Sequence, residues 1–270
     1  MALVNATGAS RTINAAQDLR SGLLGTGIWF HLAWQETRLK YKRSVIGPFW
    51  ITISTGVMVA ALGPLYGTLL KQDIATYFQH LAVSMILWAF ISGTLNESCT
   101  AFIGAAGYIK EIKLPLSAHV LRVLTKNGIL LGHNSLIILL VLVVFPPSRI
   151  ALTAAAVPGL ILLVANLMWI GMVLAILCAR FRDIPLIVMN VLQVLFFVTP
   201  IVWKREMLAE DSLVTALNPL FHMIHVVQAP LLGQIPSATS WAASVGFLIA
   251  GGGFAFWLFA KYRGRIAYWV

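Results

Sequence analysis

Long stretches of the chain carry no Asp, Glu, Lys or Arg, and the charged residues gather in short segments between them. Six stretches run for at least 20 residues without a charge: 44–70, 74–96, 127–148, 150–179, 184–203 and 212–260. A helix that crosses the ~30 Å hydrocarbon core of a bilayer needs about 20 apolar residues. The pattern therefore predicts an all-α membrane protein that crosses the bilayer several times.

Composition supports this class. Hydrophobic residues make up 59% of the chain and charged residues 10%, and the mean hydropathy is +0.87; ordinary globular chains carry about 25% charged residues. We expect a single transmembrane domain over residues 1–270, without a second soluble domain or a cleavable signal peptide. The two cysteines, Cys99 and Cys178, exclude a disulfide framework and suit small core residues.

Six transmembrane helices are predicted after an amphipathic interfacial helix at residues 14–43, where aromatic residues mix with a basic cluster. A plain juxtamembrane segment is the alternative for 14–43. Pro64 is expected to kink or end the first span. Spans 1–5 lie within residues 45–203, at 45–70, 77–105, 117–145, 150–179 and 185–203.

The last uncharged stretch, 212–260, is long enough for two spans, but its first half contains Pro219, Pro230, Gly233 and Pro236. Broken helices persist at membrane depth only where protein or a water-filled cavity satisfies their backbone groups. We therefore predict short re-entrant helices at 212–235, between spans 5 and 6, and a sixth span at 241–260.

The formal charge of +10 follows the same topology. With six spans and both termini in the cytoplasm, fifteen of the 19 Lys and Arg residues lie on the cytoplasmic side. Positive residues favour that side of a membrane. The charge therefore indicates orientation and gives no support to a nucleic-acid partner.

Motifs for catalysis are scarce. The chain has no Gly-Lys dipeptide and so no phosphate-binding loop of the G-x-x-x-x-G-K-[ST] type. If ATP drives this protein, the ATPase is another polypeptide. His222 and His225 stand at helical spacing, but no further ligand completes a metal site. Helix-end packing or a polar contact in the re-entrant region is the preferred interpretation. Glu97 is predicted to pair with Arg122 or Lys126 near the cytoplasmic interface, in preference to a proton relay.

Aromatic residues in spans 1, 2 and 5 are a second group of candidate functional residues. Aromatic faces stack on the C–H faces of sugar rings and would form a weakly specific path, although aromatic residues also form interface belts and fill cores. The candidates for a glycan path are Phe49, Trp50, Tyr66, Trp88, Phe196, Phe197 and Trp203.

The segment 107–115 is short and amphipathic, and it lies on the cytoplasmic side between spans 2 and 3. Such a helix could dock into a groove on a soluble partner or lie on the lipid surface. Its candidate contact residues are Tyr108, Ile109, Lys110, Glu111, Lys113 and Pro115.

Taken together, these segments resemble the permease subunit of type-2 ABC exporters of cell-surface polysaccharide, the Wzm-like O-antigen permeases. The resemblance covers nearly the whole chain in order. It is carried by YKRSVIGPFW at 41–50, YIKEIKLP at 108–115, ARFRDI at 179–184, TPIVW at 199–203, LNPLFH at 217–222 with APLLG at 229–233, and RGRIAYW at 263–269.

The resemblance implies a bacterial inner-membrane permease with six spans, cytoplasmic termini and an outer gate of short helices. Two copies pair with two separate ATP-binding cassette subunits, which hold the ATP and Mg. The cargo is an undecaprenyl-diphosphate-linked polysaccharide. By position, 108–115 meets the ATPase. Arg38, Lys42 and Arg43 are candidates for the lipid diphosphate, because Arg binds phosphate oxygens through two parallel hydrogen bonds; anchoring to membrane lipids is the alternative.

The sequence thus favours an O-antigen export permease that binds no cofactor itself and is not an enzyme. A permease for capsule, for teichoic acid or for a small drug is the nearest alternative. A membrane-embedded glycosyltransferase is the alternative from another class, with only Glu97, Asp183 and Glu206 as carboxylates for catalysis. A self-contained channel, which would need no ATPase, is the third.

Overall fold

The computed structural model describes residues 8–42, 46–47, 49–112, 114–209 and 212–270. Every regular element within these ranges is a helix. The elements are α1 (Gly8–Leu24), α2 (Thr26–Lys40), α3 (Phe49–Leu69), α4 (Ile74–Ser98), η1 (Ile103–Ala105), α5 (Ala106–Glu111), α6 (Leu116–Val144), η2 (Ile150–Ala155), α7 (Ala156–Arg180), α8 (Ile184–Val198), η3 (Arg205–Met207), α9 (Leu213–Ala216), α10 (Pro219–Leu231) and α11 (Ala238–Trp269).

Five helical segments of the described chain are long and apolar enough to cross a membrane: α3, α4, α6, η2 with α7, and α11. The chain is therefore a multi-pass membrane protein. The predicted fifth span corresponds to α8, which has 15 residues and a length of about 22 Å, less than the ~30 Å of a bilayer core. The helix ends at Val198 because Thr199 is extended, as expected for a residue that precedes a proline. The six-span count stays a prediction.

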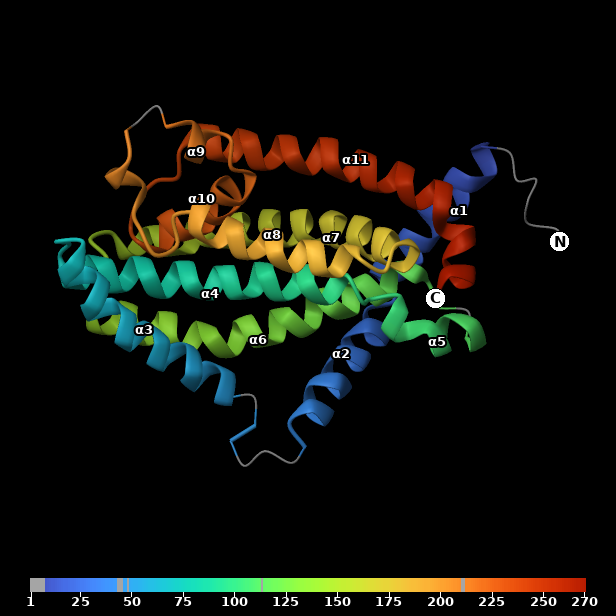
Figure 1. The fold of residues 1–270 in the computed structure, drawn as a ribbon, viewed down its shortest axis with the longest axis horizontal. Helices are drawn as coiled ribbons and strands as arrows, with labels where there is room; N and C mark the ends of the chain where they lie inside the picture. The colour runs from blue at the N-terminus through green and yellow to red at the C-terminus, as the bar shows by residue number, and fades with distance from the viewer. Residues whose placement is uncertain (1–7, 43–45, 48, 113, 210–211) are drawn as a thin grey trace.

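The long helices α4, α6, α7, α8 and α11 lie side by side along the long axis of the molecule (Figure 1). We call the end that holds α5 and the C-terminus the proximal end, and the end that holds α10 and the α3–α4 turn the distal end. α4 is the central helix, because 67% of the 18 residues in its most apolar stretch are buried inside the bundle. Its residues Ile86 and Ile91 are fully buried and belong to one apolar cluster with Leu163 and Leu167 of α7.

Two glycines of the bundle allow close approach between helices. A Cβ atom added to Gly159 of α7 would lie 2.3 Å from the carbonyl oxygen of Val226 in α10. A Cβ added to Gly251 of α11 would lie 2.3 Å from the ring of Trp169 in α7. Larger residues at these two positions would push α10 and α11 away from α7.

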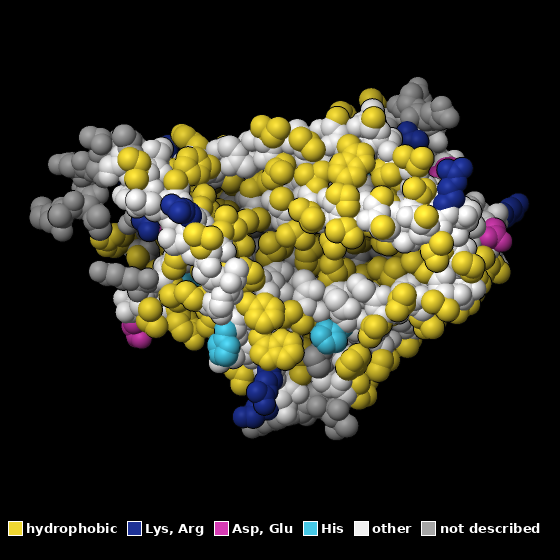
Figure 2. Space-filling view, turned by 180° about the vertical axis from the view of Figure 1, so that it is seen from behind, with side chains coloured by type: hydrophobic (Ala, Val, Ile, Leu, Met, Phe, Trp, Pro, Cys, Tyr) yellow, Lys and Arg dark blue, Asp and Glu magenta, His cyan; other side chains and the backbone are white. Residues whose placement is uncertain are grey.

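The outward face formed around α6, α7 and α11 is largely apolar, and its basic side chains stand toward the ends and the lower edge (Figure 2). Leu139 and Val143 of α6, Ile161 of α7 and Ile249 of α11 are all exposed. Lipid contact suits such a surface, because apolar side chains are stable in the hydrocarbon region and basic residues are stable beside it.

The segment predicted as one interfacial helix at 14–43 forms two helices, α1 and α2, which Gly25 separates. Glycine has a low helix propensity, which favours a break at this point. Both helices pack against α6, and α1 also packs against α11. Their placement in a membrane interface stays a prediction, and Arg43 lies outside the described residues.

Several predicted boundaries shift. Span 2 was predicted to end at residue 105, but α4 ends at Ser98 and a turn follows. Pro64 does not end α3, which continues to Leu69. α11 runs past the predicted end at residue 260 to Trp269. Its basic residues near the C-terminus are therefore part of one continuous helix.

The segment 212–235 forms the two short helices α9 and α10, where a pair of short helices was predicted. α10 starts at Asn218, whose side-chain oxygen accepts hydrogen bonds from the backbone N–H groups of Leu220 and Phe221. The turn after α10 contains Gly233 at φ +72°, a conformation that favours glycine. α10 packs against α7, α11, η2 and α4. Its depth in a bilayer stays a prediction.

Candidate functional site

α8 is the most exposed of the apolar helices. Leu192 is its one buried residue, whereas Leu186, Ile187, Val194 and Phe197 are exposed. A strongly apolar helix with so little of its surface covered is expected to contact lipid, another protein or a cargo molecule.

Four of the predicted path aromatics come together where α8 meets α4. The ring centroids of Trp88 and Phe196 lie 5.8 Å apart, and those of Phe196 and Phe197 lie 5.2 Å apart in an edge-to-face arrangement. The indole N–H of Trp203 donates a hydrogen bond of 2.9 Å to the carbonyl oxygen of Phe197. Trp88 is 8% exposed and Phe197 is 67% exposed, so the cluster extends from the core to the surface.

Polar side chains extend this cluster into an open groove between α4 and α8, with a volume of about 390 Å³. Ser92, Asn96 and Gln193 line the groove together with the aromatic residues. Asn96 and Gln193 are exposed, and their amide groups can both donate and accept hydrogen bonds. Aromatic faces beside free amides are suited to a carbohydrate that slides past without a single tight site.

Sequence reasoning missed the polar part of this groove, although a signal was present. Residues 88, 92 and 96 follow one another at intervals of four, as do residues 189, 193 and 197. Residues at this spacing share one face of a helix. The identity of the opposing helix, however, depends on packing between segments about 100 residues apart.

The three path candidates on α3 lie elsewhere. Phe49 packs edge-on against His133 of α6, with 5.3 Å between the ring centroids. Trp50 is exposed at the start of α3, and Tyr66 is half-buried near its other end. None of the three joins the ring contacts of the α4–α8 cluster within the described part of the chain.

The predicted partner-docking segment corresponds to α5 at the proximal end (Figure 1). Ile109 packs against the apolar cluster that α1, α6, α7 and α11 form there. Tyr108, Lys110 and Glu111 are exposed. Pro115 precedes the first turn of α6, and Lys113 lies outside the described residues. The helix is thus anchored on one side and open on the other.

Asp18 of α1 joins three helices directly beside α5. Its carboxylate accepts hydrogen bonds from the backbone N–H groups of Leu116 (3.1 Å) and Ser117 (3.0 Å) at the start of α6. It also accepts a hydrogen bond of 2.9 Å from Nε of Arg263 in α11. The Asp18 side chain is fully buried. A carboxylate is stable at this position because the N-terminus of a helix carries unpaired N–H donors and a positive dipole.

A second charged network connects α2 with α4 and α6. Glu36 of α2 forms a salt bridge with Arg122 of α6, and Lys126 of α6 forms one with Glu97 of α4 at 2.9 Å. Asn127 also donates to Glu97 at 2.9 Å. The predicted pairing of Glu97 is confirmed for Lys126, whereas Arg122 pairs with Glu36, a partner that the sequence did not indicate.

Two of the lipid-diphosphate candidates are exposed near the C-terminal end of α2, Arg38 and Lys42. Basic residues are stable there because the helix C-terminus carries partial negative charge. Tyr41 lies between them in the chain, and burial raises the pKa of its phenol. Arg43 lies outside the described residues, so the structure describes two of the three candidates.

His222 has structural contacts. Its ring nitrogens lie 3.0 Å from Oγ of Ser240 and 3.0 Å from the carbonyl oxygen of Ala216. It therefore fastens α10 to α11 and α9, in agreement with the helix-end packing predicted for it. Cys99 and Cys178 are both buried free thiols, as small core residues would be.

Comparison with known proteins gives a family. A model described as ABC-2 type transporter matches residues 28–232. The "O-antigen export system permease protein RfbA" of Myxococcus xanthus is 24% identical over 212 residues, which cover 75% of this chain and 79% of that protein. A protein of the same description from Klebsiella pneumoniae is 21% identical over 194 residues, which cover 70% of this chain and 74% of that protein.

Proposed function

The chain belongs to the ABC-2 type transporter family, and from this premise we propose that it is the permease of an ATP-driven exporter of a lipid-linked surface polysaccharide. O-antigen is the favoured cargo, because the similar proteins from Myxococcus xanthus and Klebsiella pneumoniae are described as O-antigen export permeases. The polymer would move from the cytoplasm to the periplasm across the bacterial inner membrane, with both chain termini in the cytoplasm.

The observation that carries this proposal is the groove between α4 and α8. Its aromatic rings and its exposed amides lie together along two neighbouring helices. A polysaccharide presents C–H faces to rings and hydroxyl groups to amides. A channel for inorganic ions would instead need rings of charged side chains or carbonyl groups at a constriction.

The proposed transporter contains a second copy of this chain and two ATP-binding cassette subunits, which hold the ATP and Mg. The exposed apolar surface of α8 would face the second copy and the path between the copies. The exposed residues of α5 would contact an ATP-binding subunit. Arg38 and Lys42 would receive the lipid diphosphate as it enters from the cytoplasmic leaflet.

Coupling would follow from the contacts around α5. Closure of the ATP-binding subunits on ATP would push α5, and the chain that leads from α5 to the start of α6 would pass this movement on. Asp18 holds α1, α6 and α11 together at this point, so the three helices would move as one body. Movement of that body relative to α8 would open the groove to the polymer.

The first test is a deletion strain in which surface glycan and cytoplasmic lipid-linked polymer are measured with the same glycan-specific reagent. An exporter predicts loss of glycan at the surface and accumulation of polymer inside. Loss in both places would favour the membrane-embedded glycosyltransferase, and no change in either place would contradict the proposed cargo. The chemical identity of an accumulated polymer separates O-antigen from capsule and teichoic acid.

A further inference from the structure

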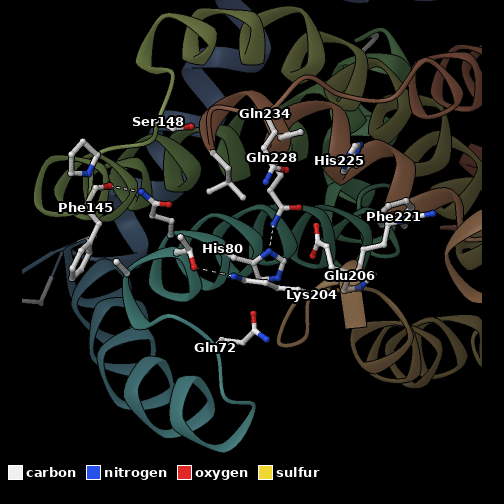
Figure 3. Close-up of a pocket in the computed structure, with 18 of the residues that line it drawn as sticks. Gln72, His80, Phe145, Ser148, Lys204, Glu206, Phe221, His225, Gln228 and Gln234 are labelled. Atoms are coloured by element: carbon white, nitrogen blue, oxygen red, sulfur yellow. Dashed lines mark hydrogen bonds between the residues drawn. The ribbon is translucent and has the colours of Figure 1, made fainter. Parts of the chain in front are cut away.

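A polar cavity of about 700 Å³ opens at the distal end of the bundle, separate from the α4–α8 groove. Four segments build it: the start of α4 with the turn before it, the α6–η2 turn, the loop after α8, and α10 (Figure 3). Its volume lies in the range of about 300–1,000 Å³ that is typical of small-molecule sites. It contains none of the residues proposed above for the path or for coupling.

Hydrogen bonds fix the inner wall of this cavity. The amide nitrogen of Gln228 lies 3.1 Å from Nδ1 of His80, and Nε2 of His80 lies 3.2 Å from the carbonyl oxygen of Trp203. Gln228 donates its second N–H to Oγ of Ser84. The donors of Gln228 are thus occupied, while its amide oxygen has no partner among the described residues. His80 and Gln228 meet at one wall in Figure 3.

Gln79, on another wall of the cavity, also has a bonded amide nitrogen and an amide oxygen without a partner among the described residues. Its amide nitrogen donates to the carbonyl oxygen of Phe145. Gln72 and Gln234 also line the cavity. The site thus holds four amide side chains, of which the two innermost, Gln79 and Gln228, are held in place by their N–H groups and offer their oxygens to a ligand.

The charges around the cavity nearly balance. Lys204 and Arg205 line it together with Glu206, and Nζ of Lys204 donates a hydrogen bond of 3.2 Å to Oγ1 of Thr76. Asp73 stands beside this position, at the N-cap of α4. An anion site would need a clear excess of positive charge or converging Arg side chains. The lining is instead that of a site for an uncharged molecule rich in hydroxyl groups.

We propose that this cavity binds a short neutral stretch of carbohydrate. The hydroxyl groups of the sugar would donate to the amide oxygens of Gln79 and Gln228, and Phe221 would supply an apolar wall. If the chain is a polysaccharide exporter, a step that rests on the proposed function, the cavity holds the polymer as it leaves the bundle. Transient binding at this end would disfavour backward sliding.

Cysteine protection tests this site directly. Ala75→Cys and Ser148→Cys place a thiol in the cavity lining without touching the hydrogen-bonded amides, and Leu208→Cys places an exposed thiol outside it. The purified protein in detergent is labelled with a hydrophilic maleimide. Two probes are compared. One is neutral polysaccharide that mild acid releases from the surface of the cells that make the protein, and the other is sodium pyrophosphate.

We expect the polysaccharide to slow labelling of Ala75→Cys and Ser148→Cys at least threefold and to leave Leu208→Cys unchanged. Adding Gln79→Leu and Gln228→Leu, which removes the two amide oxygens, should abolish this protection while the gel-filtration profile stays the same. Gln72→Ala with Gln234→Ala, at the outer lining, should only weaken it. Protection by pyrophosphate would show an anion site and overturn the proposal, as would equal labelling with and without polysaccharide.

The two proposals fail in different ways. If polymer accumulates inside the deletion strain but gives no protection of the purified protein, the cavity proposal alone is wrong. If the polysaccharide protects both cavity thiols but the deletion strain exports it normally, the cavity binds carbohydrate and the exporter proposal is wrong.

Discussion

Asp18 caps the first turn of α6 from a position almost one hundred residues earlier in the chain, through the hydrogen bond of 3.0 Å from the backbone N–H of Ser117. The hydroxyl group of Ser117 also donates to the carboxylate of Asp18 at 2.9 Å. Since α6 begins directly after the segment proposed to meet the ATPase, this contact fixes the helix that would receive the movement.

Asp18→Ala should lower the free energy of unfolding by about 3 kcal/mol, because it leaves N–H donors of α6 and the Arg263 side chain without their buried partner. Thermal unfolding in detergent, followed by tryptophan fluorescence, measures the change. Ser117→Ala is the matched control and should cost about 1 kcal/mol, because the backbone hydrogen bond remains. Equal losses in the two variants would contradict a special role for the carboxylate.

Lys126 and Glu97 form a partly exposed pair that joins α6 to α4. The double-mutant cycle with Lys126→Met and Glu97→Gln should give a coupling energy of about 0.5–1 kcal/mol, the usual value for ion pairs that water and salt can screen. High salt should reduce it. A coupling energy near zero would mean that the two side chains do not depend on each other for stability.

Lys110→Glu combined with Lys113→Glu should abolish surface glycan without removing the protein from the membrane, because the change reverses charge on the segment proposed to contact the ATPase. Immunoblots of membrane fractions and surface glycan staining are the two measurements. Arg149→Glu, at the distal end, reverses a charge far from α5 and serves as the control. Normal surface glycan in the double variant would rule out this segment as the coupling site.

Phe197→Ala should reduce export several-fold while it changes the free energy of unfolding by no more than about 0.5 kcal/mol, since the Phe197 ring is largely exposed. Trp88→Ala should instead cost about 3 kcal/mol, because it leaves a cavity beside Phe196 in the core. Export rate and thermal midpoint are measured for both. Full export by Phe197→Ala would exclude this ring from the path.

Burial lowers the pKa of the Lys204 ammonium group, and the attraction of Glu206 and Asp73 opposes that shift. Between this lowered value and 10.5, the ordinary value for lysine, the unfolded chain binds more protons than the folded chain. Stability should therefore rise with pH across this window. The thermal midpoint of Lys204→Met, compared with that of the unchanged protein, should lack this rise. Parallel pH profiles for the two proteins would contradict the assignment.

The sequence by itself determined the class of this protein, because its signals are local. A run of about 20 uncharged residues is stable in lipid whatever its neighbours are, so the five long membrane helices and the two short helices at 212–235 could be predicted. A partner for Glu97 at Arg122 or Lys126 could also be predicted, because the end of one span and the start of the next lie at the same side of the membrane; the structure shows that the partner is Lys126. The break at Gly25 and the short length of α8 were missed, although Gly25 and Pro200 were visible.

Only the tertiary structure decided which segments meet. Asp18 reaches Ser117 across 99 residues, and Gln228 reaches His80 across 148 residues. No periodicity or motif connects such positions, because the contact forms only after helices from separate parts of the chain have packed. The groove between α4 and α8 and the cavity at the distal end arise in the same way, because the side chains that line each of them come from segments far apart in the chain.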